Sequence, residues 1–266
     1  MEVSMYAKEE KFLQQVVKQA YKHIIKKHTF EVSAKGEKDL VTTLDLATET
    51  FIIEQLKKHF PNDYIVSEEF HSTSQLQGRC WVIDPIDGTL SFANNIRDWC
   101  IQMAFVHNGA VQASVIFIPT SKELYFASNQ GAFCNGKPIH VQSNVEPENA
   151  LFYMGNVNVK YKNMNTCACM FQQKLSEQIM RTRNLGSAGC EFALVAHGKA
   201  HGYILFADNM WDYLPGMFLC EKAGGVSLHT TMLHNPIHIS LANQELANLV
   251  QKLITESEKI YKNNKK

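Results

Sequence analysis

Two aspartates, Asp84 and Asp87, stand three residues apart in the segment WVIDPIDGTLSF at residues 81–92. The apolar residues before Asp84 predict a short buried strand that ends at this pair. Gly88 and Thr89 come next, at the start of a predicted helix, where free N–H groups bind anions. Two carboxylates beside an anion site repel a phosphate unless cations lie between them. The segment therefore predicts a hard divalent metal, Mg²⁺ first, joining carboxylate and phosphate oxygens; the alternative is a solvent-exposed loop in which aspartates form turns.

A further acid, Glu68, follows a short apolar segment that predicts a strand over residues 64–66. Asp84 also follows a predicted strand. If these two strands pair, their ends bring Glu68 and Asp84 together at one edge of a sheet. Glu68 is then a third carboxylate for the metal. The simpler interpretation is a solvent-facing charge at the end of a strand.

Two more aspartates lie where predicted helices begin. Asp45 precedes a helix predicted over residues 46–60, and Asp212 falls in the first turn of a helix predicted over residues 209–223. Asp45 or Thr43 can cap its helix, which is a purely structural role. Asp212 can serve only the helix dipole, or it can be a fourth metal carboxylate delivered from the second half of the chain.

A segment rich in small residues, LGSAGCE at 185–191, leads into a helix predicted over 192–197. Small residues at a helix start let a ligand approach the backbone N–H groups closely. Tight packing of the helix on a sheet explains the same composition equally well.

The composition is that of an ordinary globular protein. The 266 residues are 45% hydrophobic and 20% charged, with a formal net charge of zero, so no field of one sign favours nucleic acid or an anionic membrane as a partner. The seven cysteines form no CxxC pair, which is typical of free thiols in a reducing cytosol. The N-terminus lacks the apolar run of a signal peptide, and no apolar run approaches the ~18 residues that span a membrane. We therefore expect a cytoplasmic protein.

The predicted elements alternate between helices and runs of strands. Helices are predicted over residues 8–27, 46–60, 164–180, 192–197, 209–223 and 244–261. Strands are predicted over residues 64–66, 81–83, 100–107, 110–118, 123–128, 139–141, 151–154, 201–206, 226–228 and 237–241. The polar, glycine-containing start of the segment at 35–45 predicts a mobile loop, and Pro85 predicts a turn. This pattern favours antiparallel or mixed sheets with helices layered on them, in one domain over residues 1–266. The polar segment 144–149 predicts a seam between two halves, roughly 1–143 and 144–266.

Four motifs in the chain match those of one known family. The segment DPIDGT at 84–89 matches D-P-[IL]-D-G-T, and SEE at 67–69 matches [GS]-E-E. The segment DLVTTLD at 39–45 matches D-x-V-T-x-x-D, while WDYLPG at 211–216 and EKAGG at 221–225 match W-D…G…E-A-G-G. The motifs occur in the family's order and span nearly the whole chain. The chain thus resembles the inositol monophosphatase family of magnesium-dependent, lithium-sensitive phosphomonoesterases.

The resemblance implies two to three Mg²⁺ ions and names their ligands. Glu68, Asp84 and the backbone carbonyl of Ile86 would bind the first ion, and Asp84, Asp87 and Asp212 the second. A third, more weakly bound ion would lie near Glu68.

The resemblance also implies the catalytic and substrate-binding residues. Asp45 and Thr89 would orient and deprotonate the attacking water, with Glu68 as a third catalytic residue. The N–H groups of Gly88 and Thr89 would bind phosphate oxygens. The remaining residues expected to contact the substrate, the last three on its alcohol side, are Asp87, Asp212, Gly186, Ser187 and Ala188.

The implied reaction is hydrolysis of a small phosphate monoester, of inositol or a related sugar or polyol, by metal-activated water. Leu205 departs from the pattern, because it stands where inositol-specific members place a glutamate that binds inositol hydroxyls, and leucine cannot accept those bonds. Histidinol phosphate, fructose 1,6-bisphosphate and 3′-phosphoadenosine phosphate are therefore alternatives. The last ranks lower, because it usually goes with a basic residue where this chain has Leu90.

A different class of function is a regulatory binding protein on the same scaffold, in contact with nucleic acid or a polymerase. The loss of a metal carboxylate would favour it, but none is lost, and the neutral charge also counts against it.

The resemblance implies a layered α-β-α-β-α sandwich, an α/β (α+β) fold with two sheets between helices. It also implies a homodimer, since family members often form one.

Overall fold

Seven strands between Tyr64 and Pro138 form one sheet, in the order β3-β4-β5-β6-β7-β8-β9. From β4 onward each strand is antiparallel to the next, whereas β3 runs parallel to β4. The hairpin between β5 and β6 turns at Asn108 and Gly109, as the sequence predicts. The strands of this sheet are β3 Tyr64–Ser67, β4 Arg79–Asp87, β5 Cys100–His107, β6 Ala110–Ile118, β7 Glu123–Ser128, β8 Gly131–Cys134 and β9 Lys137–Pro138.

A second sheet of five strands has the order β11-β10-β12-β14-β13. It is mixed, because β10 runs parallel to both β11 and β12, whereas β14 is antiparallel to β12 and β13. Its strands are β10 Leu151–Met154, β11 Arg181–Arg183, β12 Gly202–Leu205, β13 Val226–Met232 and β14 Asn235–Leu241. A separate hairpin consists of β1 Val32–Gly36 and β2 Asp39–Thr42.

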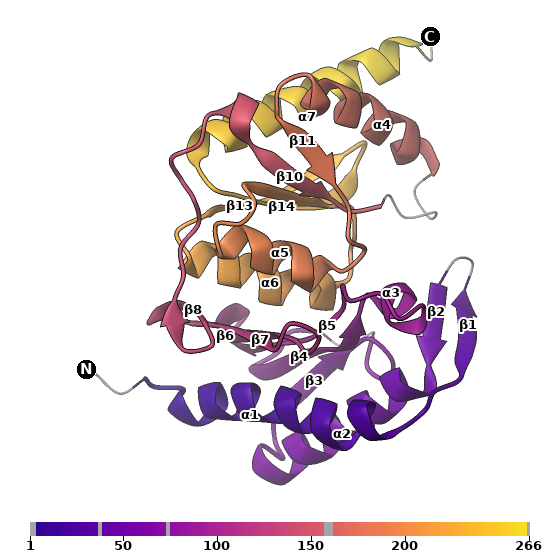
Figure 1. Cartoon of the computed structure of the whole chain (residues 1–266), viewed down its shortest axis with the longest axis vertical. Coiled ribbons are helices and arrows are strands. Elements are labelled where there is room, and N and C mark those ends of the chain that lie inside the picture. The colour runs from indigo at the N-terminus through magenta and orange to yellow at the C-terminus, as the bar shows by residue number, and fades with distance from the viewer. Residues whose placement is uncertain (1–3, 37–38, 73–74, 157–161, 265–266) are drawn as a thin grey trace.

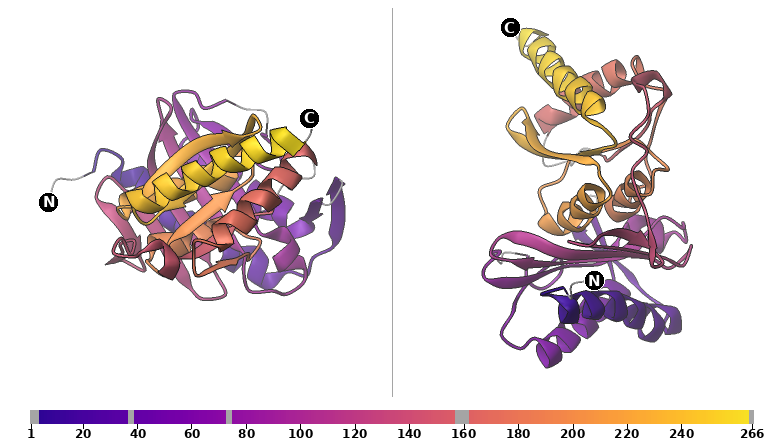
Figure 2. Two further views of the ribbon diagram at one scale, coloured as in Figure 1. Left: turned by 90° about the horizontal axis from the view of Figure 1, so that it is seen from above. Right: turned by 90° about the vertical axis from the view of Figure 1, so that its left-hand side faces the viewer.

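Helices and sheets alternate in five layers, as Figures 1 and 2 show. The computed structural model describes residues 4–36, 39–72, 75–156 and 162–264. Helices α1 and α2 cover the outer face of the seven-stranded sheet, α5 and α6 lie between the two sheets, and α4 and α7 cover the five-stranded sheet. This is the α-β-α-β-α sandwich that the resemblance to the family implies. The α-helices are α1 Ala7–His23, α2 Thr43–His59, α3 Thr89–Ala93, α4 Lys162–Ser176, α5 Ala188–Ala196, α6 Met210–Lys222 and α7 Gln244–Asn264; η1 Ile25–Lys27 and η2 Pro147–Asn149 are short 3₁₀ turns.

Burial patterns explain which helices take the outer and inner layers. Helix α1 buries one stripe, which includes Phe12 and Val16, and turns its lysines to solvent, whereas Glu9 is buried and pairs with Arg79. In α5 every residue except Leu194 is buried, because both of its sides face a sheet. A helix that is apolar all round needs such an inner position. Among the described residues, no helix is both long and apolar enough to cross a bilayer.

Two large hydrophobic clusters lie on opposite faces of the seven-stranded sheet. One includes α1, α2 and the strand residues Trp81 and Phe105. The other includes α5, α6, the five-stranded sheet and the outer helices α4 and α7. Helices α5 and α6 therefore connect the two sheets through one continuous core. The division into halves near residue 143 stays a prediction.

The structure corrects the loop predicted for the start of residues 35–45. Its described residues belong to the β1–β2 hairpin and to helix α2, which already begins at Thr43. The helix cap is Thr42 rather than Thr43, and its hydroxyl accepts bonds from the N–H groups of Leu44 and Asp45. The carboxylate of Asp45 accepts a bond from the N–H of Thr42 at 2.8 Å, which completes a capping box.

Two strand predictions also change. Strand β4 does not end before Asp84 but continues through Pro85 to Asp87, with an irregular register against β5 between the two aspartates. Because proline lacks an N–H, an irregular register is where a strand tolerates it. The strand predicted over residues 139–141 is absent from the structure, and the chain instead pairs earlier, as β8 and β9.

Helices α5 and α6 touch at Gly216, and this contact gives a testable prediction. An alanine Cβ at this position would lie 2.2 Å from Cδ2 of Phe192. Gly216→Ala is therefore expected to lower the free energy of unfolding by about 1–3 kcal/mol, although alanine is the better helix former. Urea unfolding measures the loss. Combining it with Phe192→Ala, which removes Cγ and Cδ2 of Phe192, should recover part of the loss, and additive losses would show that the ring is not the obstacle.

Candidate active site

A cavity of about 1190 Å³ lies where the ends of β4 and β12 meet α6. The chain supplies its walls from both halves. Of the residues predicted for the site, those that line this cavity are Glu68, Asp84, Ile86, Asp87, Gly88, Thr89, Gly186 and Asp212. Asp45, Ser187 and Ala188 stand behind the wall and reach the site through hydrogen bonds.

Asp84 is the most strongly perturbed acid of the cavity. Its side chain is buried, and Oδ2 accepts a bond from Nε2 of Gln102 at 3.3 Å. Its Oδ1 is buried and has no hydrogen-bond partner among the described residues. Burial raises its pKa well above the ordinary value, and the charges of Glu68, Asp87 and Asp212 raise it further. A buried oxygen without a donor, surrounded by other carboxylates, fits a bound cation, and an all-oxygen ligand set fits Mg²⁺.

Asp87 is held by the N-terminus of α5. Its Oδ2 accepts bonds from the hydroxyl of Ser187 at 2.6 Å and the N–H of Gly189 at 2.7 Å, and its Oδ1 accepts one from the N–H of Ala188 at 3.2 Å. The thiol of Cys100 approaches Oδ2 at 3.3 Å. Burial raises the pKa of Asp87, while these hydrogen bonds oppose the shift. Ser187, Ala188 and Gly189 therefore orient a carboxylate, while Gly186 lines the cavity. The expected contact of this segment with the alcohol of a substrate stays a prediction.

Glu68 is positioned by Glu49, which the sequence reasoning missed. Glu49 is fully buried on α2 and accepts bonds from the hydroxyl of Ser67 and from the N–H groups of Glu69 and Phe70, the latter two at 2.9 Å. These bonds fix the backbone on either side of Glu68. The signal available in the sequence was the spacing, because Glu49 repeats with the apolar residues of the buried face of α2.

Lys35 of β1 is a second group that the sequence reasoning missed. Its Nζ lies 3.2 Å from Oε1 of Glu68 and 2.9 Å from Oε1 of Glu69. Burial raises the pKa of Glu68, and the charge of Lys35 opposes that shift. Burial lowers the pKa of Lys35, but the two glutamates outweigh it and the net shift is upward. The hairpin thus brings a cation to the acidic cluster.

Asp45 and Thr89 form a connected pair beside the cluster. The hydroxyl of Thr89 lies 3.1 Å from Oδ1 of Asp45 and 3.0 Å from the carbonyl oxygen of Ile86, so one proton has two acceptors. The hydroxyl and N–H of Thr42 hold the other carboxylate oxygen. Burial raises the pKa of Asp45, and the bonds from Thr42 and Thr89 oppose the shift. Asp45 therefore both caps helix α2 and hydrogen-bonds to Thr89 of the predicted site.

Gly88 forms a close backbone approach at the start of α3. Its φ is +87°, and an added Cβ would lie 2.9 Å from the carbonyl oxygen of Asp98 and 3.0 Å from Cβ of Ser187. Any side chain would therefore collide with the neighbouring backbone. The absence of a side chain leaves the peptide groups of Gly88 and Thr89 at the cavity wall, as a backbone anion site requires.

The far side of the cavity is partly apolar. Leu205, at the end of β12, is 7% exposed and lines the cavity with Phe206. Asn184 lies on the same side, where its Nδ2 donates to the carbonyl oxygen of Met154 at 2.7 Å. Asp208 follows Leu205 by three residues in the sequence. It is not among the described residues that line the cavity, so it does not supply the carboxylate that Leu205 lacks.

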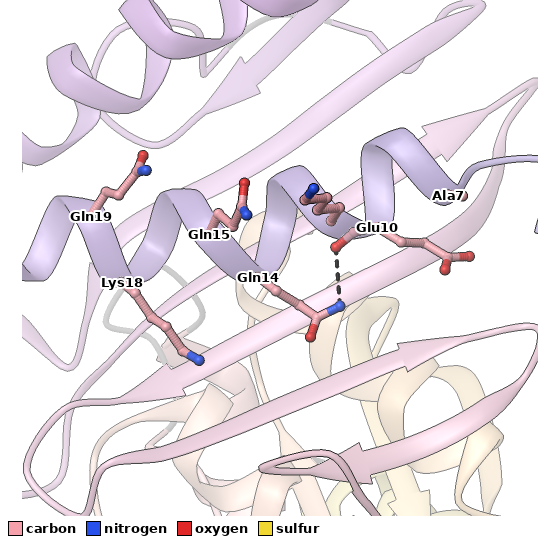
Figure 3. Close-up of a pocket in the computed structure, with 7 residues that line it drawn as sticks. Ala7, Glu10, Gln14, Gln15, Lys18 and Gln19 are labelled. Atoms are coloured by element: carbon pink, nitrogen blue, oxygen red, sulfur yellow. Dashed lines mark hydrogen bonds between the residues drawn. The ribbon is translucent and has the colours of Figure 1, made fainter.

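A second hollow, of about 580 Å³, follows the outer surface of α1 (Figure 3). One face of this helix supplies all of its walls, including Glu10, Gln14 and Lys18, and Nε2 of Gln14 donates to the carbonyl oxygen of Glu10. The side chains in Figure 3 spread along the helix and do not converge on one point. It therefore lacks the clustered acids of the first cavity.

Comparisons with known proteins agree with this geometry. The family model described as "Inositol monophosphatase family" matches residues 4–262. Fructose-1,6-bisphosphatase/inositol-1-monophosphatase of Thermotoga maritima is 33% identical over 72% of each chain, and Nus factor SuhB of Escherichia coli K12 is 31% identical over 77% of each. A solved structure of a Thermotoga maritima IMPase superposes with a TM-score of 0.78 at 27% identity, over 95% of this chain and 97% of that one. The chain therefore belongs to the inositol monophosphatase family, whose members are phosphoric monoester hydrolases.

Proposed function

We propose that this protein hydrolyses a small phosphate monoester with the help of Mg²⁺. The observation that carries the proposal is the environment of Asp84. Its buried Oδ1 has no hydrogen-bond partner among the described residues, and three further carboxylates raise its pKa. Such a cluster is costly to bury without cations, and phosphate needs the same cations in order to approach it.

Two ions would be bound by the residues that line the cavity. Glu68, Asp84 and the carbonyl oxygen of Ile86 would hold one, and Asp84, Asp87 and Asp212 the other, with a third near Glu68. When bound, Mg²⁺ lowers the pKa of coordinated water and neutralises charge on the phosphate and the leaving oxygen. Asp87 and Asp212 would also face the substrate, and Glu68 the attacking water.

Asp45 and Thr89 supply a proton acceptor for the attacking water. The hydroxyl of Thr89 can accept a hydrogen bond from water while it donates its own proton to Oδ1 of Asp45, 3.1 Å away. Burial raises the pKa of Asp45, which makes its carboxylate a stronger base than an exposed aspartate. The pair would thus orient the water and take up its proton.

The backbone of Gly88 and Thr89 would bind the transferred phosphoryl group. The positive φ of Gly88 and the close approach of Asp98 leave no space for a side chain there. N–H groups at a helix start then stabilise the charge that develops on phosphate oxygens. The alcohol part of the ester would extend past Gly186 toward Leu205.

Leu205 makes a specific test of the alcohol side. Leu205→Glu is expected to raise kcat/KM for inositol phosphate relative to other esters at least ~10-fold, since a carboxylate at this wall can accept hydroxyl donors. Phosphate release from paired substrates measures the ratio. Leu205→Gln, similar in size but uncharged, is the matched control. An unchanged ratio would show that this wall does not contact the alcohol.

A panel of phosphomonoesters tests the proposed function. Phosphate release is measured with Mg²⁺, with EDTA, and with Mg²⁺ plus Li⁺, on inositol phosphates, sugar phosphates, fructose 1,6-bisphosphate, histidinol phosphate and 3′-phosphoadenosine phosphate. Turnover that requires Mg²⁺ supports the reaction, and the preferred ester identifies the alcohol. No turnover on the whole panel, from folded protein that binds Mg²⁺, would contradict it.

A regulatory role is the second candidate, favoured by the likeness to Nus factor SuhB. The same scaffold would then act by binding a macromolecule, with or without turnover. Binding of RNA or of a transcription protein by an Asp84→Asn variant that has lost hydrolysis would favour this role, and turnover on the panel without such binding would count against it.

A further inference from the structure

Away from the carboxylate cluster, the β7–β8 hairpin and the end of α5 bring together three different metal-binding side chains. Glu123 is the first residue of β7, Cys134 is the last residue of β8, and His197 follows the last residue of α5. One ligand atom from each lies within 4.8 Å of the others. We propose that Glu123, Cys134 and His197 form a zinc site that is separate from the catalytic cavity.

The hairpin geometry explains why these side chains meet. In the antiparallel pair, Cys134 stands directly opposite Tyr125, and Glu123 lies two residues before Tyr125 on the same face of β7. The ring of His197 packs edge-on against Tyr125 with ring centres 5.6 Å apart. The hydroxyl of Tyr125 and Nδ1 of His197 are 3.1 Å apart, which fixes the orientation of the imidazole.

The ligand set selects the metal. A thiolate, an imidazole and a carboxylate together suit Zn²⁺, whereas Mg²⁺ takes oxygen ligands. The thiolate is the form of cysteine that binds a metal, so an ion has to displace the thiol proton of Cys134. Glu123 and His197 are partly exposed, which leaves a route for the ion. The hydroxyl of Tyr125 also hydrogen-bonds to Glu123 and Cys134, so an ion would have to replace these bonds.

Two electrostatic features already attract a cation to this place. His197 lies at the C-terminal end of α5, where the helix dipole is negative. Nζ of Lys199 lies 3.0 Å from Oε1 of Glu123, with 43% of its side chain exposed. A bound Zn²⁺ would displace this ammonium, at little cost because the pair faces solvent.

The proposed zinc site lies apart from the catalytic cavity, and an ion bound there would affect stability rather than turnover. Helix α5 has nine residues, so its two ends lie ~13 Å apart. Its N-terminus donates to Asp87, whereas its C-terminus carries His197. An ion here would fasten α5 to the edge of the seven-stranded sheet. Zinc binding should therefore raise the melting temperature without replacing Mg²⁺ in turnover.

The test uses the full chain, stripped with EDTA and then saturated with Mg²⁺ so that the carboxylate cluster is filled. We expect about one Zn²⁺ per chain to remain after gel filtration in excess Mg²⁺. Substituting Co²⁺ should give a near-ultraviolet thiolate-to-cobalt absorption band. Cys134→Ser should abolish the band and weaken zinc binding by more than ~100-fold, since even residues that only support a metal ligand cost 10–100-fold.

Three matched variants locate the ion. Cys169→Ser, at the exposed cysteine, should leave the band unchanged. Lys199→Ala should tighten zinc binding, because it removes the ammonium that competes for Glu123. His197→Gln should weaken zinc binding as Cys134→Ser does, and melting curves show that each variant is folded. Equal zinc binding by wild type and Cys134→Ser, or a band that depends on Cys100 instead, would overturn the proposal.

Discussion

Replacing Asp84 by asparagine is expected to lower kcat/KM at least ~10³-fold and, at neutral pH without metal, to raise the melting temperature. The first effect follows because Asp84 would bind both proposed ions, which together would lower the activation free energy by several kcal/mol. The second follows because Asp84 is buried among Glu68, Asp87 and Asp212, so its charge opposes folding when no cation is present. Phosphate release and thermal melting measure the two effects.

The pH dependence of stability distinguishes the removal of a buried charge from a general loss of structure in the variant. The folded pKa of Asp84 lies above its unfolded value near 4, so stability is lost as pH rises from the unfolded pKa through the folded pKa. Metal-free wild type should lose more stability from pH 4 to 8 than Asp84→Asn. Added Mg²⁺ should stabilise the wild type much more than the variant. Equal response of both proteins to Mg²⁺ would contradict the assignment of Asp84 as a ligand.

Glu49→Ala is expected to lower the free energy of unfolding by about 3–5 kcal/mol and to weaken Mg²⁺ binding more than 10-fold. Glu49 never lines the cavity, but its carboxylate satisfies one hydroxyl and two backbone N–H groups around Glu68. Removing it leaves the two partly buried N–H groups without this acceptor, and leaves the hydroxyl of Ser67 only Nδ1 of His71, 3.3 Å away. It also lets the Glu68 backbone move. Urea unfolding and the Mg²⁺ concentration for half-maximal activity measure the two effects.

Glu49→Gln is the informative control. Its amide oxygen can still accept the bonds that Oε1 now receives from Ser67 and Phe70, whereas its NH₂ would face the N–H of Glu69. We therefore expect a smaller loss of both stability and Mg²⁺ affinity than in Glu49→Ala. Unchanged Mg²⁺ dependence in Glu49→Ala, despite lower stability, would show that Glu49 stabilises the fold without positioning Glu68.

Most strands were predictable, because the periodicity of apolar residues follows local geometry, whereas the layer order was implied by the resemblance to the family. The hairpin around Asn108 and Gly109 and the strand at 123–128 have the predicted bounds. The convergence of Glu68 and Asp84 was also predictable, since it needs only that β3 and β4 pair. The continuation of β4 through Pro85 was not predictable, because it depends on β5 accepting an irregular register.

Contacts between distant segments explain the other differences. Ser187 and Ala188 donate to Asp87, which lies in the first half of the chain, and the sequence analysis did not include this contact. A local sequence pattern does not predict this contact, because the contact forms only when α5 packs on the seven-stranded sheet. The β1–β2 hairpin is similar: its polar, glycine-containing sequence resembles a loop, and only pairing and the contact of Lys35 with Glu68 give it regular structure.

The strands of the seven-stranded sheet all lie between Tyr64 and Pro138, whereas Asp212 stands far toward the C-terminus. A ribosome therefore releases Asp84 and Asp87 long before helix α6 exists. The nascent chain can pair these strands without the repulsion that Asp212 adds. Asp212 joins the other carboxylates only when α6 docks late in synthesis. If the protein binds the proposed ions, their site would be complete only at that stage, and a truncated chain that lacks α6 is expected to be inactive.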